Sequence, residues 1–137
     1  MIDRISKELR SRVMRSVKSK NTKPELFVRK VLTKLGYRYR IHARKVPGKP
    51  DIVFTKRRKV LFVHGCFWHG HKGCARGAIA DSDFWRKKIN ANIERDERIL
   101  LQLSKDDWSH LVIWECELRD MTQITAKLTL FLGPTCV

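Results

Sequence analysis

Residues 59–74 read KVLFVHGCFWHGHKGC, an apolar run followed at once by a segment rich in histidine and cysteine. The run KVLFVH at 59–64 is typical of a central β-strand, because strands covered on both faces are apolar almost throughout. The stretch contains three of the five histidines and two of the four cysteines of the chain, with two adjacent aromatic residues between them. It therefore predicts a buried strand whose carboxyl end combines metal ligands, catalytic groups and aromatic rings that grip a flat partner.

The patterns on either side of this strand predict a layered α/β domain, a central mixed sheet flanked by helices. Thr22-Lys-Pro-Glu25 has the form of a helix start with a capping box, and Gly36 ends the apolar stripe that follows. Strands are expected at 37–41, 51–54 and 110–116, a long helix at about 84–103 after a cap at Ser82 or Asp83, and a closing helix with Ile124, Leu128 and Phe131. The stripe of the long helix contains Trp85, Ile89, Ile93, Asp96, Leu100 and Leu103.

Length and composition fit one globular unit. A chain of 137 residues with 42% hydrophobic residues can bury one core but is too short for two domains to be expected. We divide it into a basic N-terminal segment, 1–20, and a single domain, 21–137. No signal-peptide pattern and no apolar run of roughly 18 residues occurs, so we expect a soluble, intracellular protein without a membrane partner.

The net charge of +16 lies entirely in the first part of the chain. Residues 1–59 hold 20 Lys and Arg against four Asp and Glu, whereas residues 60–137 hold ten of each sign. A one-sided excess of this size indicates a surface for a polyanion, with nucleic acid as the expected partner. The alternative is a basic surface without a partner.

The four cysteines point to metal binding rather than disulfides, because no secretory signal accompanies them. Cys66, His71 and Cys74 lie within nine residues, and Cys116 ends a predicted strand that can pass beside them. These residues form a Cys₃His set suited to tetrahedral, structural zinc. The alternative is a group of reduced cysteines that are buried one by one.

The remaining histidines and three carboxylates are candidates for catalysis. His64 closes the apolar strand and His69 lies in the loop beside it; either can also be a bystander of the metal site. Asp51 opens a buried strand, where a carboxylate is costly unless it binds a cation or finds a partner. Asp96 sits on an apolar helix stripe, and we assign it to His69 as a hypothesis, whereas the capping box alone can account for Glu25.

Three aromatic residues are candidates for contact with nucleic acid. Phe67 and Trp68 lie between glycines and metal ligands, where a rigid exposed wedge can form. Trp85 stands at the start of the long helix and can equally be a core residue. Wedges of this kind unstack base pairs and bend the duplex.

Four segments resemble the very-short-patch-repair (Vsr) endonucleases. They are GKPD at 48–51, VHGCFWHGHKGC at 63–74, FWRKKINANIERD at 84–96 and VIWECELR at 112–119. The resemblance implies a restriction-endonuclease-like fold and a DNA-repair enzyme that acts on a T:G mismatch, the product of 5-methylcytosine deamination. The enzyme would nick the thymine strand 5′ to the T. It implies Mg²⁺ as catalytic cofactor and Zn²⁺ as structural cofactor.

The resemblance also implies roles for individual residues. Asp51 and the backbone carbonyl of Val63 would bind catalytic magnesium, Glu25 and His64 would position metal-bound waters, and His69 supported by Asp96 would transfer the proton. The implied zinc ligands are Cys66, His71, Cys74 and Cys116. Phe67, Trp68 and Trp85 would insert from the major groove, with Met14 from the minor groove and Arg15 of the same basic segment contacting DNA.

Two other functions fit the same residues: a site-specific or homing-type endonuclease, and a non-catalytic zinc-stabilised nucleic-acid-binding module. Asp51 and Asp96 argue against the second, since a passive binder has no use for carboxylates that face a phosphate. For the repair enzyme we expect a monomer in the cytoplasm, associated with the nucleoid, with mismatch-repair proteins as possible partners.

Overall fold

A computed structural model of the chain describes residues 21–71 and 83–135. The elements are α2 (Lys23–Leu35), β1 (Arg40–Ile41), β2 (Ile52–Phe54), β3 (Lys59–His64), α3 (Asp83–Lys105), β4 (Ser109–Trp114), the 3₁₀ helix η2 (Glu115–Arg119) and α4 (Met121–Leu132). The α/β class predicted from the sequence is confirmed. Within the described ranges, no helix has both the length and the apolar character that crossing a bilayer demands.

The sheet is mixed, as expected, and its strands lie in the order β1-β2-β3-β4. β1, β2 and β3 pair antiparallel, whereas β3 and β4 pair parallel, with His64 opposite Trp114. A parallel pair needs a long crossover between its strands. Here α3 lies within that crossover, so the loop after β3 and the end of β4 come to the same edge of the sheet.

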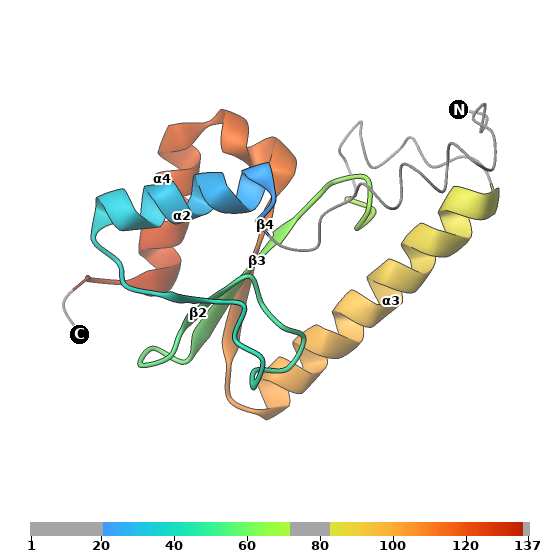
Figure 1. The fold of residues 1–137 in the computed structure, drawn as a ribbon, viewed down its shortest axis with the longest axis horizontal. Helices are drawn as coiled ribbons and strands as arrows, with labels where there is room; N and C mark the ends of the chain where they lie inside the picture. The colour runs from blue at the N-terminus through green and yellow to red at the C-terminus, as the bar shows by residue number, and fades with distance from the viewer. Residues whose placement is uncertain (1–20, 72–82, 136–137) are drawn as a thin grey trace.

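α2 and α4 lie on one side of the sheet and α3 lies on the other (Figure 1), and alternate residues of the strands belong to two different cores. Ile52, Leu61 and Ile113 pack in one core with α2 and α4. Val53 and Val60 pack in a second, smaller core with Leu103 of α3. β3 is thus covered on both faces, which explains its apolar sequence.

α2 begins and ends where the sequence predicts. The Thr22 side chain accepts a hydrogen bond from the Glu25 amide, the Glu25 side chain accepts one from the Thr22 amide, and Pro24 lies in the first turn. Gly36 ends the helix in the left-handed region, at φ 90°. This conformation favours glycine because it has no Cβ.

The other helices follow the prediction with two differences. The buried residues of α3 are Trp85, Ile89, Asn92 and Leu103. Ile93 and Leu100 belong to the expected stripe but are only partly buried, whereas Asn92 is buried although it was not expected to be. On α4 Leu132 is buried with Ile124 and Leu128, while Phe131 is partly buried at the edge of the core. The apolar face of each helix is rotated slightly from the position predicted.

Three predicted strands are too long. Only Arg40–Ile41 pairs in the segment 37–41, because Tyr37 turns into the core beside α2. Asp51 precedes β2 rather than opening it, and β4 ends at Trp114. Glu115 and Cys116 therefore belong to η2, which corrects the expectation that Cys116 ends a strand.

Candidate active site and metal-binding cluster

Asp51 lies beside the end of β3. Its Oδ2 accepts a hydrogen bond from the Val63 amide at 2.7 Å, which fixes the carboxylate against the strand. Burial raises the pKa of Asp51 to about 6, the nearby charge of Glu25 adds to the rise, and the Val63 hydrogen bond opposes it. The Asp51 carboxylate can therefore serve as an oxygen ligand for a cation, because neighbouring groups balance its negative charge only in part.

His69 and Asp96 form a hydrogen-bonded pair between the loop and α3. His69 Nδ1 lies 2.7 Å from Asp96 Oδ2, so Nδ1 carries the proton and the neutral ring keeps its lone pair on Nε2. Burial acts to raise the pKa of Asp96, but the hydrogen bond from His69 opposes it, and that pKa lies below its ordinary value. The contact expected between these two residues is present, and it leaves His69 able to accept a proton.

His64 stacks on His69. The two ring centroids are 3.8 Å apart and the planes are nearly parallel, at 5°. Burial next to His69 lowers the pKa of His64 to about 3, so the ring is neutral at physiological pH. Its Nδ1 is buried and makes no hydrogen bond within the part of the chain that the structure describes. The stack therefore presents two imidazoles at the end of β3.

A second cluster of ligand atoms lies beside this stack. Cys66 Sγ, a nitrogen of His71 and Cys116 Sγ lie within 4.8 Å of one another, and Cys116 Sγ is 3.5 Å from His71 Nδ1. Thiolate and imidazole are the ligands that tetrahedral zinc prefers, so the chemistry of these groups fits that ion. Cys74, the fourth ligand of the predicted set, lies outside the described residues.

Trp114 separates the two clusters. Its ring stacks on His71, with centroids 4.1 Å apart and an angle of 9° between the planes, and meets His64 edge-on at 5.2 Å. Trp114 is the last residue of β4, directly opposite His64 in the parallel register. The Trp114 ring therefore sets the distance between His71 of the candidate metal cluster and His64 of the candidate catalytic site.

Three aromatic rings form a cluster on the loop and the start of α3. Phe67, Trp68 and Trp85 meet pairwise edge-to-face, with centroid separations of 5.0 to 5.6 Å. Trp85 is only 6% exposed, whereas Phe67 and Trp68 are partly buried. Phe67 and Trp68 are the more accessible rings, and Trp85 supports both.

The loop is attached to α3 by two close contacts. Asn92 Nδ2 donates a hydrogen bond to the Trp68 carbonyl at 2.8 Å. Gly70 has φ 63°, and a Cβ there would lie 2.7 Å from Ile93 Cδ1 and 2.9 Å from Ile89 Cγ2. Only glycine allows the chain to approach the helix so closely, which brings His69 to Asp96.

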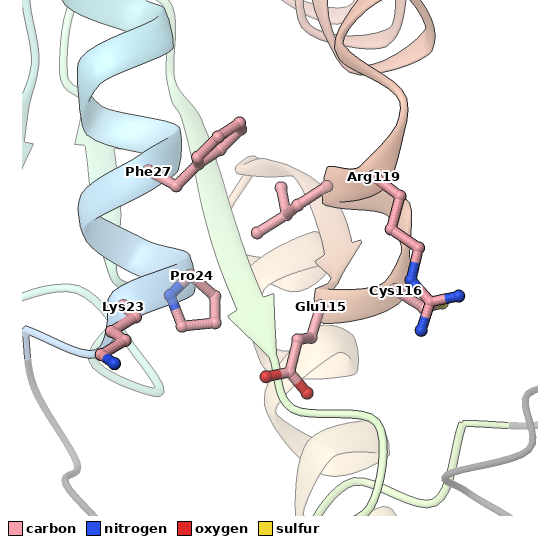
Figure 2. A pocket seen from close by; sticks show the side chains of 7 residues that line it. Lys23, Pro24, Phe27, Glu115, Cys116 and Arg119 are labelled. Atoms are coloured by element: carbon pink, nitrogen blue, oxygen red, sulfur yellow. The ribbon is translucent and has the colours of Figure 1, made fainter.

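An open cavity of about 350 Å³ lies between α2 and η2, and Cys116 is one of the residues that line it (Figure 2). Lys23, Pro24 and Phe27 line it from α2, and Glu115 and Arg119 are among the residues that line it from η2. None of the four residues Asp51, His64, His69 and Asp96 lines this cavity. The candidate catalytic groups gather instead around the end of β3, where His64 stacks on His69 and the Val63 amide holds Asp51.

Some residues of the site were not predicted from the sequence, and some predicted residues lie outside the part of the chain that the structure describes. Asn92, Trp114, Arg29 and His42 were missed; the last two contact Glu25. For Asn92, a signal was available in its position four residues before Asp96 on the same face of the helix. Met14 and Arg15 lie outside the described residues, as does the whole segment 1–20.

Comparisons with known proteins agree with one another. Residues 2–76 match the model of the family described as DNA mismatch endonuclease Vsr. The chain is 50% identical over 137 residues to the type II nicking enzyme V.XorIIP of Xanthomonas oryzae pv. oryzae, a match that covers 98% of this chain and 100% of that relative. It is 37% identical over 126 residues to the DNA mismatch endonuclease Vsr of Escherichia coli K12, covering 91% of this chain and 81% of the relative.

Proposed function

This chain belongs to the DNA mismatch endonuclease Vsr family, and on that premise we propose that it recognises a T:G mismatch and nicks the thymine strand 5′ to the T. The observation that carries the proposal is the hydrogen-bonded His69–Asp96 pair beside the end of β3, the strand whose Val63 amide holds the Asp51 carboxylate. A proton-transfer group at the same end of the sheet as a half-buried carboxylate is the arrangement that hydrolysis of a phosphodiester needs.

Asp51 and the carbonyl of Val63 would hold magnesium. Both offer oxygen, which Mg²⁺ prefers, and a cation would relieve the cost of burying the Asp51 charge. When bound, the ion would neutralise developing charge at the scissile phosphate. The Val63 amide fixes the carboxylate in place, so this part of the chain is already arranged before a cation binds.

His69 would accept the proton of the attacking water through Nε2, since Asp96 holds its Nδ1. Glu25 and His64 would hold water molecules nearby. The neutral His64 ring can accept a hydrogen bond from water at a nitrogen that carries no proton. The nick also needs a proton for the leaving oxygen, which a protonated His69 can return.

Cys66, His71 and Cys116, with Cys74, would bind structural zinc. None of residues 65–71 belongs to either core, so a cross-link to η2 through the ion would order this loop. Such sites contribute on the order of 10 kcal/mol to folding. The ion would therefore hold the segment that carries Phe67, Trp68 and His69.

Phe67 and Trp68, supported by Trp85, would enter the DNA stack beside the mismatch. A mismatched pair is easier to unstack than a matched one, so insertion of the rings would cost less free energy at a mismatch and would favour binding there. Met14 and Arg15 would contact DNA from the basic segment 1–20, and residues 21–137 would form the nuclease domain, acting as a monomer.

The test is strand-resolved cleavage of end-labelled duplexes in Mg²⁺, comparing T:G with the matched C:G in several sequence contexts. We expect a nick 5′ to the mismatched T that disappears in Asp51→Ala. Equal cutting of both duplexes would replace the proposal with a site-specific endonuclease. Binding without cutting would leave the zinc-stabilised binding module.

A further inference from the structure

Glu25 makes more contacts than a helix cap requires. It is 1% exposed, and one oxygen, Oε2, completes the capping box by accepting from the Thr22 amide at 3.3 Å. The other oxygen, Oε1, has no part in the cap. Oε1 accepts hydrogen bonds from two further side chains, those of Arg29 and His42.

The two side chains converge on one atom. Arg29 Nη2 lies 2.7 Å from Oε1 and His42 Nε2 lies 2.9 Å from it. Because a carboxylate only accepts, His42 Nε2 must carry a proton, and its 3.3 Å approach to Arg29 Nη2 is a meeting of two donors around a shared oxygen. Arg29 Nη2 is also held by Asn21 Oδ1 at 2.9 Å.

His42 reaches Glu25 through an uncommon backbone conformation. Its φ is 51°, in the left-handed region, just after β1 ends. Non-glycine residues adopt this conformation rarely, although histidine is among those that tolerate it. The chain therefore accepts a local cost that brings the imidazole to a residue 17 positions earlier in the sequence.

Stability alone does not explain the arrangement. Pairing a buried carboxylate with a guanidinium rarely stabilises a fold more than apolar packing would, because both charges lose water. Glu25 also lies close enough to Asp51 for its charge to help raise the Asp51 pKa. Two neighbouring carboxylates disfavour each other's charged forms unless cations compensate them.

We propose that Arg29 and His42 are positioning residues for the nicking reaction, and that they fix the Glu25 carboxylate beside Asp51 so that it can hold the waters around a divalent cation. The inference rests on the proposed function. It adds two residues that bear on catalysis only through Glu25. Burial acts to raise the pKa of Glu25, but hydrogen bonds from Arg29 and His42 outweigh it, so the group stays charged.

The chain permits a matched pair of variants at His42. In His42→Gln the amide nitrogen takes nearly the place of Nε2 and can still donate, whereas in His42→Asn the side chain is too short to reach Oε1. Asparagine tolerates positive φ, so His42→Asn should fold. Arg29→Met tests the second donor, and His110→Asn, a partly buried histidine at the other end of β4, controls for the loss of an imidazole.

The measurements are the single-turnover nicking rate at saturating enzyme, the Kd for the T:G duplex, and the Kd of Mn²⁺ for the DNA-free protein by calorimetry. We expect His42→Asn and Arg29→Met to slow nicking and weaken Mn²⁺ binding about 10- to 100-fold, as loss of groups that orient metal-site residues commonly does. The duplex Kd should change less than about threefold, and His42→Gln and His110→Asn should stay near wild type.

A double-substitution cycle separates positioning from general damage. If His42 acts through Glu25, His42→Asn should slow nicking by less than about twofold further in a Glu25→Gln background. Full additivity, or single variants that nick and bind Mn²⁺ like wild type, would overturn the proposal. If the wild type fails to nick T:G, the proposed function falls, and the Mn²⁺ comparison of His42→Asn with His42→Gln still decides whether the positioning role holds.

Discussion

Two clusters share the loop after β3, and they differ in chemistry although the Trp114 ring contacts a histidine of each. Cys66 and His71 meet Cys116 of η2, whereas His69 meets Asp96 of α3 and stacks on His64. The first cluster offers thiolates and an imidazole, the ligands of a closed structural site. The second contains the hydrogen-bonded His69–Asp96 pair at the end of β3, where the Val63 amide also holds the half-buried Asp51 carboxylate. Alternating residues of one short loop can therefore serve stability and catalysis separately.

The largest effect on stability is expected at Cys116, in the cluster that contains the cysteines. Cys116→Ala should lose zinc and lower the free energy of unfolding by several kcal/mol, since a complete site contributes on the order of 10 kcal/mol. Metal content by mass spectrometry and thermal unfolding measure both effects. Cys136→Ala, which also removes one thiol but lies outside the predicted ligand set, is the matched control. Stoichiometric zinc in Cys116→Ala would remove Cys116 from the ligand set.

A substitution at Asp51 should have opposite effects on activity and stability: nicking should slow, and the protein without metal should become more stable. Asp51→Asn keeps an acceptor for the Val63 amide but removes the negative charge, so nicking should fall about 10⁴-fold, equivalent to the several kcal/mol that a catalytic cation supplies. Burial raises the pKa of Asp51 to about 6, so the metal-free variant should gain roughly 1–3 kcal/mol of stability at neutral pH. Nicking rates and denaturation in a chelator test this pair of effects. Asp107→Asn, an exposed carboxylate near the start of β4, should change neither, and nicking near the wild-type rate in Asp51→Asn would exclude Asp51 from the mechanism.

A substitution at His69 should affect activity alone. His69→Gln removes the proposed proton acceptor and should slow single-turnover nicking about 10³-fold, within the range of general-base catalysis. Zinc content and thermal stability should stay near wild type, because His69 belongs to the cluster without cysteines. Loss of zinc in His69→Gln would mean that the two clusters share a ligand.

How much of this arrangement the sequence could predict depends on the kind of signal. The strand 59–64 and the cap at Thr22 were predictable because apolar runs and capping boxes are local patterns. The contact between Asp96 and His69 was predictable because a carboxylate on an apolar stripe needs a partner. The Glu25–His42 contact was not, since it depends on a positive φ after a two-residue strand.

The shape of the loop also escaped sequence analysis. Trp114 lies between the clusters only because β4 ends opposite His64, and the pattern 110–116 suggested a longer strand. Asn92 lies on the same helix face as Asp96, but its partner is a backbone carbonyl, which no side-chain pattern reveals. Contacts with backbone atoms and register between distant strands are set by the whole fold.

The smallest predicted effect concerns how the loop is attached to α3. Asn92→Ala removes the hydrogen bond to the Trp68 carbonyl, and a bond of this kind contributes about 0.5–1.5 kcal/mol. Nicking of T:G should slow about 3- to 10-fold, the kinetic equivalent of that energy, with zinc content unchanged. Asn90→Ala, at an exposed position two residues earlier on α3, is the control, and single-turnover rates of the two variants give the comparison. If Asn92→Ala lost zinc as well, the attachment to α3 would support both clusters, and stability and catalysis would be coupled through Trp68 rather than kept apart.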